Sequence, residues 1–345
     1  MNMRFPWPAP GGKKARLRVG IDIGLSAVKI LRVEVARDRT ARALEPVIEA
    51  VPEPTPAAQK AALQRAIVAA NLPPGADVRL SMAGQDIMTR CLTLPAMTAT
   101  ELDGAIRFEG ETYLPFPIND VVIDKQILES LNGNKMRVLL VAGKRDTIQA
   151  HVAWIQECGL RPALVDVDAL AVVNAYVADQ EGPPPPLTTA LVHIGVRFTN
   201  VAILQRGQLC CFTRDLTIAG QDLTKTIAEQ LGVPPTEAEQ LKFQPGERGD
   251  DVNRAVHAAL ELLANELRLS LDFYESQFEG GVERMVLTGG TSLVPLVPPF
   301  LKEQLNLPIE PWTPQRWLTR HGLQVSKDVA ARLAVCVGLA SREDL

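Results

Sequence analysis

The sequence has few of the residues that mark metal centres, disulfide scaffolds or membrane spans. Its 345 residues include four histidines and five cysteines, an odd number without C-x-x-C spacing. Adjacent Cys210 and Cys211 are a poor disulfide pair, so we expect reduced thiols in buried strands and no metal cluster. No stretch approaches about eighteen uninterrupted apolar residues, and prolines interrupt the N-terminal region where a signal peptide needs its apolar core. The sequence therefore predicts a cytoplasmic protein.

Charge of one sign is also lacking. Lys and Arg number 36 against 40 Asp and Glu, which gives a formal net charge of -4, and the basic residues are scattered. This pattern argues against nucleic-acid binding. The two common nucleotide motifs, G-x-x-x-x-G-K-[ST] and G-x-G-x-x-G, are absent as well. Any nucleotide site must therefore be assembled from distant segments.

One pattern occurs twice, about half a chain apart. Residues 18–33 (RVGIDIGLSAVKILRV) and 190–204 (ALVHIGVRFTNVAIL) each read as an apolar strand, an Ile-Gly turn, a polar break and a second apolar strand. The turn residues Gly24 and Gly195 have no Cβ, so backbone N–H groups can approach a phosphate closely. Single strands that end in glycine are common in α/β proteins, but the pair predicts two lobes that close on a nucleotide.

A third segment adds to this prediction. Residues 285–296 (MVLTGGTSLVPL) read as a short strand that leads into Gly289 and Gly290. Thr291 or Ser292 is then expected to cap a helix that continues through residue 301. A strand, a double glycine and a helix N-terminus together favour nucleotide binding.

The rest of the chain alternates strands and helices, which predicts an α/β fold of two lobes. Residues 85–163 have the character of an inserted α/β subdomain, with a hairpin signal at Asn132-Gly133. Residues 256–278 carry apolar side chains at three- and four-residue steps, which predicts a buried helix face. The other expected elements are strands at 43–50, 78–82 and 163–167 and helices at 57–70, 100–113, 146–158, 168–181, 221–231 and 329–339.

Asp22 and Lys29 flank the first glycine turn. A carboxylate at the start of a phosphate hairpin commonly holds Mg²⁺ through water, because magnesium keeps much of its hydration shell. Lys29 would serve as a point charge for phosphate oxygens. The alternative is that Asp22 is a turn-forming acid and Lys29 a solvent-facing strand residue.

The second hairpin carries His193 where the first has Asp22. Neutral histidine is a poor magnesium ligand, and a histidine on an apolar strand is more often a satisfied core residue than a catalyst. No residue is identified that would orient water against a terminal phosphate. Nucleotide binding is therefore better supported than turnover. Asp222 is a candidate helix N-cap, and Glu239 and Lys242 read equally well as solvated helix charges.

Several motifs occur in the order of the actin-like ATPase superfamily, which the chain resembles along nearly its whole length. They are IDIG…K at 21–29, the second hairpin, AGQDLT at 219–224, AEQLK at 238–242 and TGGTSL at 288–293. Three further stretches resemble PilM, a family of cytoplasmic actin-like proteins of type IV pilus assembly. These are LPAMTATELDGAIRFEGETYLPFP at 94–117, DKQIL at 124–128 and FTRDLTIAGQDLT at 212–224.

The resemblance implies an actin-like ATPase fold of two lobes with a 1C insertion, as in FtsA and PilM. After a flexible N-terminal tail (1–16), subdomain 1A would comprise 17–84 and 164–186, with 1C at 85–163. Subdomain 2A would comprise 187–220 and 282–345, with 2B at 221–281.

The resemblance also implies ATP and Mg²⁺ between the lobes. Asp22 resembles the magnesium-associated acid, and Gly24, Ser26 and Lys29 the first phosphate loop. Gly195 resembles the second phosphate loop. Glu239 and Lys242 resemble the adenine side of the site, and Gly289 and Gly290 the adenosine loop.

Family membership would further imply a scaffold that binds the cytoplasmic N-terminal peptide of the inner-membrane protein PilN around 1A and 1C. The protein would then lie at the inner membrane only through PilN and would contact other pilus assembly proteins, including motor components.

Two residues depart from the superfamily pattern: His193 stands at an aspartate position, and Leu25 where a small hydroxyl residue is common. These departures predict weak or absent hydrolysis. The alternatives are an adaptor of division or type II secretion and, less favoured because of His193, a small-molecule kinase.

Overall fold

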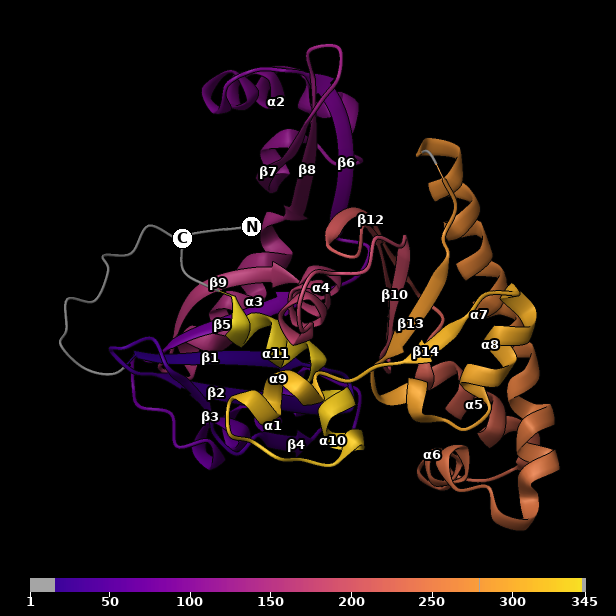
Figure 1. Ribbon diagram of the computed structural model, residues 1–345. Coiled ribbons are helices and arrows are strands. Elements are labelled where there is room, and N and C mark those ends of the chain that lie inside the picture. Colours follow the sequence, from indigo (N-terminus) through magenta and orange to yellow (C-terminus); the bar gives the residue numbers. More distant parts are fainter. Residues whose placement is uncertain (1–15, 279, 343–345) are drawn as a thin grey trace.

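The computed structural model describes residues 16–278 and 280–342, which form two lobes with a smaller sheet projecting from the first (Figure 1). The expected N-terminal tail, 1–16, lies outside the described residues except for Arg16, which begins strand β1. No helix in the described part of the chain is both long and apolar enough to cross a membrane.

The two lobes are built on sheets of the same topology. The first has the order β3-β2-β1-β5-β9, with β4 also on β2, and the second the order β12-β11-β10-β13-β14. In each sheet an antiparallel hairpin (β1-β2, β10-β11) is followed by a parallel strand (β5, β13). The internal repeat predicted from the two hairpins is therefore confirmed.

The first lobe packs helices on both faces of its sheet. Its strands are β1 (Arg16–Ile23), β2 (Ala27–Val35), β3 (Ala41–Ala43), β4 (Val47–Ala50), β5 (Asp77–Met82) and β9 (Arg161–Val167). Helices α1 (Pro56–Ala69) and α3 (Arg145–Glu157) share one core with alternate side chains of β1 and β5. The strand expected at 43–50 is instead two short strands, because Pro46 lacks the N–H that a continuous ladder needs.

The projecting sheet consists of β6 (Ile87–Pro95), β8 (Lys135–Lys144) and β7 (Val121–Leu131), in that order. Helix α2 (Ala99–Tyr113) covers one face, and the 3₁₀ turn η1 (Ile118–Asp120) leads from it into β7. Thr98 caps α2, since its hydroxyl accepts from Glu101 N while Glu101 Oε2 accepts from Thr98 N at 2.7 Å. The predicted hairpin and helix of this region are thus confirmed.

The second lobe has its helices on the side of the sheet away from the first lobe (Figure 1). Its strands are β10 (Thr189–Ile194), β11 (Thr199–Gln205), β12 (Leu209–Leu216), β13 (Arg284–Thr288) and β14 (Ile309–Pro311). Its helices are α5 (Gly220–Leu231), α6 (Pro235–Phe243), α7 (Gly249–Gln277) and α8 (Val297–Leu305), with 3₁₀ turns η2 (Gly246–Arg248) and η3 (Gly290–Leu293). The apolar stripe predicted for α7 is buried from Val256 to Tyr274, as expected.

Two helices lie between the sheets. Helices α4 (Asp168–Asp179) and α11 (Ala334–Ser341) pack against each other, and their cores include side chains from strands of both lobes. The contact is so close that a Cβ on Gly338 would lie 1.7 Å from the carbonyl oxygen of Ala171. Short helices α9 (Gln315–Arg320) and α10 (Lys327–Arg332) precede α11, so the single helix expected at 329–339 is in fact divided at Leu333.

Candidate nucleotide-binding site

The two glycine turns have the same geometry. Gly24 N donates to Ala27 O at 3.0 Å, and Gly195 N donates to Phe198 O at 3.0 Å. A Cβ at Gly24 would lie 2.9 Å from Ala27 O, and one at Gly195 3.0 Å from Phe198 O. Both turns are therefore too tight for a larger residue without a shift of the backbone. Ser26 lies exposed in the first turn.

The residues that flank each turn are cross-strand partners at the same spacing. In the first lobe Asp22 pairs with Lys29, and in the second lobe His193 pairs with Asn200. Lys29 Nζ donates to Asp22 Oδ2 at 2.6 Å, whereas His193 Nδ1 and Asn200 Oδ1 are 3.1 Å apart. An ion pair in one lobe thus corresponds to a neutral hydrogen bond in the other.

The Asp22–Lys29 pair is largely withdrawn from solvent. The two side chains are 11% and 15% exposed, so the interpretation of Lys29 as a solvent-facing residue is wrong. Burial alone would lower the pKa of Lys29, but the charge of Asp22 and its hydrogen bond outweigh burial and raise it. Lys29 therefore stays charged at neutral pH and depends on Asp22 for compensation.

A row of polar residues crosses the second sheet from β13 to β12. It consists of Thr288, His193, Asn200 and Asp215, each opposite the next. Asn200 Nδ2 donates to Asp215 Oδ1 at 2.7 Å, and Asp215 Oδ2 accepts from Gly84 N of the first lobe at 2.7 Å. This row therefore ends in a direct hydrogen bond between the lobes.

The same row fixes the tautomer of His193. Because the amide nitrogen of Asn200 donates to Asp215, its oxygen faces His193 and must accept from Nδ1. Burial lowers the pKa of His193, so the ring is neutral and Nε2 carries a lone pair. The ring carbons on either side of Nε2 lie near Gly195 and Gly289, which places this acceptor between the two glycine loops.

Asp168 is a member of the site that the sequence reasoning missed. It opens α4 directly after β9, and the sequence marked it only as a helix start. Burial, with the nearby charge of Asp22 next, raises its pKa to about 7. Its Oδ1 is buried and has no hydrogen-bond partner. A carboxylate with one buried oxygen that lacks a partner, close to Asp22, is a feature expected where a cation is to be bound.

The double glycine lies against the second hairpin. Gly289 has φ +94°, and a Cβ there would lie 2.6 Å from Ile194 O and 2.9 Å from the His193 ring. Thr291 Oγ1 donates to Gly195 O at 2.8 Å, which joins the two loops. No α-helix begins here, contrary to the expectation. Residues 290–293 form a 3₁₀ turn, and Pro295 holds Val294 extended, so α8 starts only at Val297.

Lys242 and Glu239 connect α6 to the same region. Lys242 is almost fully buried and donates to Glu239 at 2.6 Å, to Thr224 at 2.9 Å and to Gly220 O at 3.2 Å. Gly220 N in turn donates to Gly195 O at 3.0 Å. Lys242 is therefore not an ordinary solvated charge, whereas Glu239 remains half exposed.

Asp222 is not the N-cap of α5, contrary to one expectation. It is the third residue of that helix, and its side chain accepts from Ala219 N at 2.8 Å. The carboxylate thus satisfies a backbone donor just before the helix, as the third residue of a capping box does.

The donor set suits Mg²⁺ held through water better than Mg²⁺ held directly. Asp22 and Asp215 both influence the pKa of Asp168, so the three carboxylates lie around one region. Within 16–278 and 280–342, however, no three His, Cys, Asp or Glu side chains are close enough to bind a metal on their own. Magnesium keeps several waters when it binds protein, so these carboxylates fit a hydrated ion.

Asp168 predicts a pH-dependent stability. Its pKa is about 7 in the fold and near 3.8 when unfolded, so the folded state binds more protons between these values. Stability is therefore lost as pH rises from about 4 to 7. We expect the free energy of unfolding of Asp168→Asn to be about 2–4 kcal/mol higher than that of the unsubstituted protein at pH 8, and equal to it near pH 4. Urea unfolding at both pH values, with exposed Asp272→Asn as control, measures this; equal curves at pH 8 contradict it.

Comparisons with known proteins identify the family and the fold. The family model described as type IV pilus assembly protein PilM matches residues 20–344. A solved structure titled PilM-PilN type IV pilus biogenesis complex has a TM-score of 0.79 and 25% identity, covering 95% of this chain and 98% of that one. MreB 5 of Spiroplasma citri bound to AMPPNP has a TM-score of 0.52 at 10% identity, covering 94% of this chain and 95% of that one. The actin-like fold predicted from the sequence is thereby confirmed.

A more distant curated relative is the cell division protein FtsA of Neisseria meningitidis serogroup B. It is 23% identical over 261 residues, which cover 64% of this chain and 61% of FtsA. The chain thus spans less than two thirds of the length of this relative.

Proposed function

Since the chain belongs to the type IV pilus assembly protein PilM family, we propose that it is a nucleotide-binding adaptor of the pilus inner-membrane complex. ATP with Mg²⁺ would lie between the lobes, and the cytoplasmic N-terminal peptide of PilN would bind around subdomains 1A and 1C. The proposal includes the division into 1A, 1C, 2A and 2B at the boundaries expected from the sequence.

One observation carries the nucleotide proposal: two glycine turns of equal geometry, one from each lobe, with a third glycine loop packed on the second turn. Backbone N–H groups in such turns bind phosphate oxygens without side chains in the way. Around these turns lie a charged lysine and a carboxylate with one unpartnered oxygen, which are groups that suit phosphate and hydrated magnesium.

We assign roles by position. Gly24, Ser26 and Lys29 would contact phosphate oxygens from the first lobe and Gly195 from the second. Asp22 and Asp168 would orient the waters of the magnesium ion. That ion would supply positive charge that neutralises the phosphates.

The nucleoside would lie against the second lobe. Gly289 and Gly290 would line the adenosine, because their lack of a Cβ leaves room beside His193 and Ile194. Glu239 and Lys242 would border the adenine from α6. The buried Lys242 holds this edge in place through Gly220 and Thr224.

Hydrolysis should be weak or absent. A general base must reach the attacking water, but Asp215 is held by Asn200 and by Gly84 N, and Asp168 would be engaged with the waters of the magnesium ion. Neutral His193 presents a lone pair rather than a proton toward the glycine loops, so it cannot stabilise negative charge on phosphate. We infer that ATP acts as a ligand that favours one arrangement of the lobes, through its different affinity for the two states.

PilN is the proposed partner because a structure of a PilM-PilN complex covers 95% of this chain. PilN would also account for attachment to the inner membrane, and other pilus proteins, motor components among them, would be reached through the same assembly. The similarity to FtsA extends over 64% of the chain and keeps a division adaptor as the second candidate. Capture of a PilN N-terminal peptide by the purified protein separates the two.

Calorimetric titration tests the nucleotide site. We expect ATP to bind the purified protein at least tenfold more tightly with Mg²⁺ than with EDTA, and Asp168→Asn to remove most of that difference. Exposed Asp272→Asn should behave like the unsubstituted protein. Adding a PilN N-terminal peptide then measures coupling between the sites. Absence of ATP binding together with intact peptide binding would overturn the nucleotide proposal and leave a scaffold without a nucleotide.

A further inference from the structure

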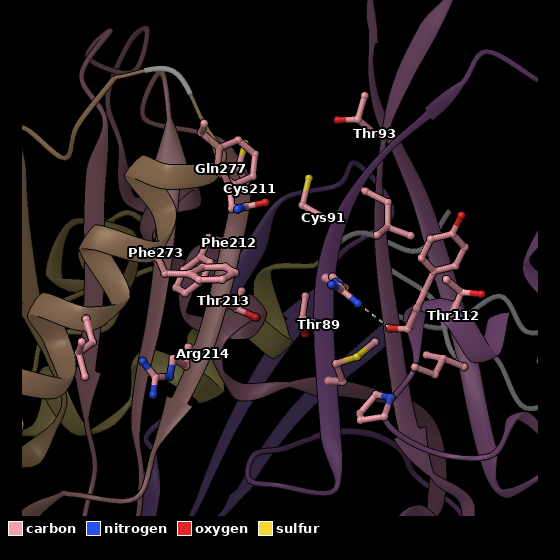
Figure 2. A pocket seen from close by; sticks show the side chains of 18 residues that line it. Thr89, Cys91, Thr93, Thr112, Cys211, Phe212, Thr213, Arg214, Phe273 and Gln277 are labelled. Carbon is pink, nitrogen blue, oxygen red and sulfur yellow. Dashed lines mark hydrogen bonds between the residues drawn. The ribbon is translucent and has the colours of Figure 1, made fainter. Parts of the chain in front are cut away.

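A cavity of about 930 Å³ separates the projecting sheet from the second lobe (Figure 2). One wall is β6 with the end of α2, and the other is β12 with the last turns of α7. Both β6 and β12 are edge strands of their sheets. Two subdomains are thus separated here by a space that small molecules can enter.

Cys91 and Cys211 line opposite walls of this cavity (Figure 2). Cys91 is opposite Leu139 of β8, whose side chain packs in a core shared with the second lobe, so Cys91 is on the sheet face toward that lobe. Cys211 is the extra residue of a β-bulge, because Leu204 pairs with Cys210 and Ile203 with Phe212. Bulges on edge strands redirect a side chain, and this one directs Cys211 toward Cys91.

The surroundings make Cys211 the more reactive thiol. Arg137 of β8 donates to Cys211 Sγ at 3.7 Å. A hydrogen bond from the Cys91 thiol, followed by the charge of Arg137, lowers the pKa of Cys211 against the opposing effect of burial, while the pKa of Cys91 is raised. Neighbouring Cys210 lacks these partners, and burial raises its pKa to about 12. A thiol of lowered pKa beside a second thiol is an arrangement that favours disulfide formation, because the thiolate is the attacking species.

We propose that Cys91 and Cys211 are a redox-responsive pair that closes into a disulfide between the projecting sheet and the second lobe. The bond would tie β6 to β12 across the cavity. It would restrict the movement of these two subdomains and reduce the space between them. This proposal does not depend on nucleotide or PilN binding.

The chemistry balances with hydrogen peroxide as oxidant. The Cys211 thiolate attacks one peroxide oxygen, the O–O bond breaks, and water leaves after proton uptake, which gives a sulfenic acid. Cys91 sulfur then attacks the Cys211 sulfur, the S–O bond breaks, and a second water leaves. Two thiols and one peroxide thus yield one disulfide and two waters. A dithiol reductant reverses the reaction by thiol–disulfide exchange.

Peroxide treatment of the purified full chain tests this proposal. The five cysteines are free thiols. After peroxide, we expect the number of free thiols to fall by two. Mass spectrometry without reductant should then find one linked peptide that joins Cys91 to Cys211. Dithiothreitol should restore all five thiols. Cys210→Ser should form the same link. Cys91→Ser should form none and should instead leave a sulfenic acid at Cys211 that dimedone traps.

Two further variants test the role of Arg137 and control for the serine substitution at Cys91. Arg137→Gln should slow formation of the link at least severalfold without changing which cysteines are joined. Cys91→Ala should match Cys91→Ser, which guards against an effect of the serine hydroxyl. A Cys210–Cys211 link, a link between two molecules, or an unchanged thiol count after peroxide would each overturn the proposal.

Discussion

Replacing Gly338 by alanine is expected to lower the free energy of unfolding by about 3 kcal/mol or more. Its Cβ would lie 1.7 Å from the Ala171 carbonyl oxygen and 2.5 Å from the carbonyl carbon, both backbone atoms of α4. Overpacking typically costs about 1–3 kcal/mol when side chains can move aside. Backbone inside a buried helix pair cannot do so, which places this variant at or beyond the upper end.

A matched control is available in α2. Gly104 is also a helix glycine, but a Cβ there would meet nothing within 4 Å. Gly104→Ala should therefore stabilise the protein by about 1 kcal/mol, because alanine is the better helix former. Chemical unfolding followed by circular dichroism compares the two variants. Equal changes in stability would mean that α4 and α11 can separate at little cost.

The position of this contact links it to function. Helices α4 and α11 lie between the two sheets, and α4 begins with Asp168 of the candidate site. A shift of α4 away from α11 would therefore move Asp168 relative to Asp22. If Gly338→Ala folds at low temperature, its Mg²⁺-dependent ATP binding should be weaker than that of Gly104→Ala.

The sequence was most informative where structure is local. Each glycine hairpin lies within about sixteen consecutive residues, so apolar alternation and one glycine were enough to predict strands, turn and repeat. The buried face of α7 follows in the same way from the spacing of its apolar residues. The resemblance to PilM also rested on short continuous motifs, and the family match over residues 20–344 confirms it.

Features that depend on tertiary contacts were not predictable in this way. Asp168 and Asp215 lie 146 and 193 positions from Asp22, and only the packed lobes bring their charges together. Neither aspartate belongs to a sequence motif that marks it as part of a site. The helix expected directly after Gly290 is absent for a local reason instead: Pro295 lies within the expected helix and forces Val294 to be extended.

Replacing Asp22 by alanine is expected to lower the free energy of unfolding by about 3–5 kcal/mol. Asp22 is the acid that compensates Lys29, and both side chains are at least 85% withdrawn from solvent. Removing one partner of a buried ion pair leaves the other charge without compensation, which costs about this much. The loss should exceed that from removing both partners together.

The double variant Asp22→Ala with Lys29→Met is therefore the informative comparison. It removes the charge along with its partner and keeps a side chain of similar length. We expect it to regain most of the stability lost in Asp22→Ala, while ATP binding stays weak in both variants. If the double variant were as unstable as Asp22→Ala, the loss would come from packing around Asp22 and not from the uncompensated charge of Lys29.

The pH dependence of stability independently tests whether the uncompensated charge of Lys29 destabilises Asp22→Ala. With Asp22 present, the pKa of Lys29 is raised above its usual 10.5, so the stability from the ion pair is fully present below that usual value and is lost as pH rises through the raised pKa. In Asp22→Ala, burial is the largest influence left on Lys29 and lowers its pKa, so the folded state binds fewer protons than the unfolded one at alkaline pH. The stability of Asp22→Ala should then rise toward that of the double variant as pH increases from 7 to about 10. A difference that stays constant over this range would show that Lys29 is not the group left uncompensated.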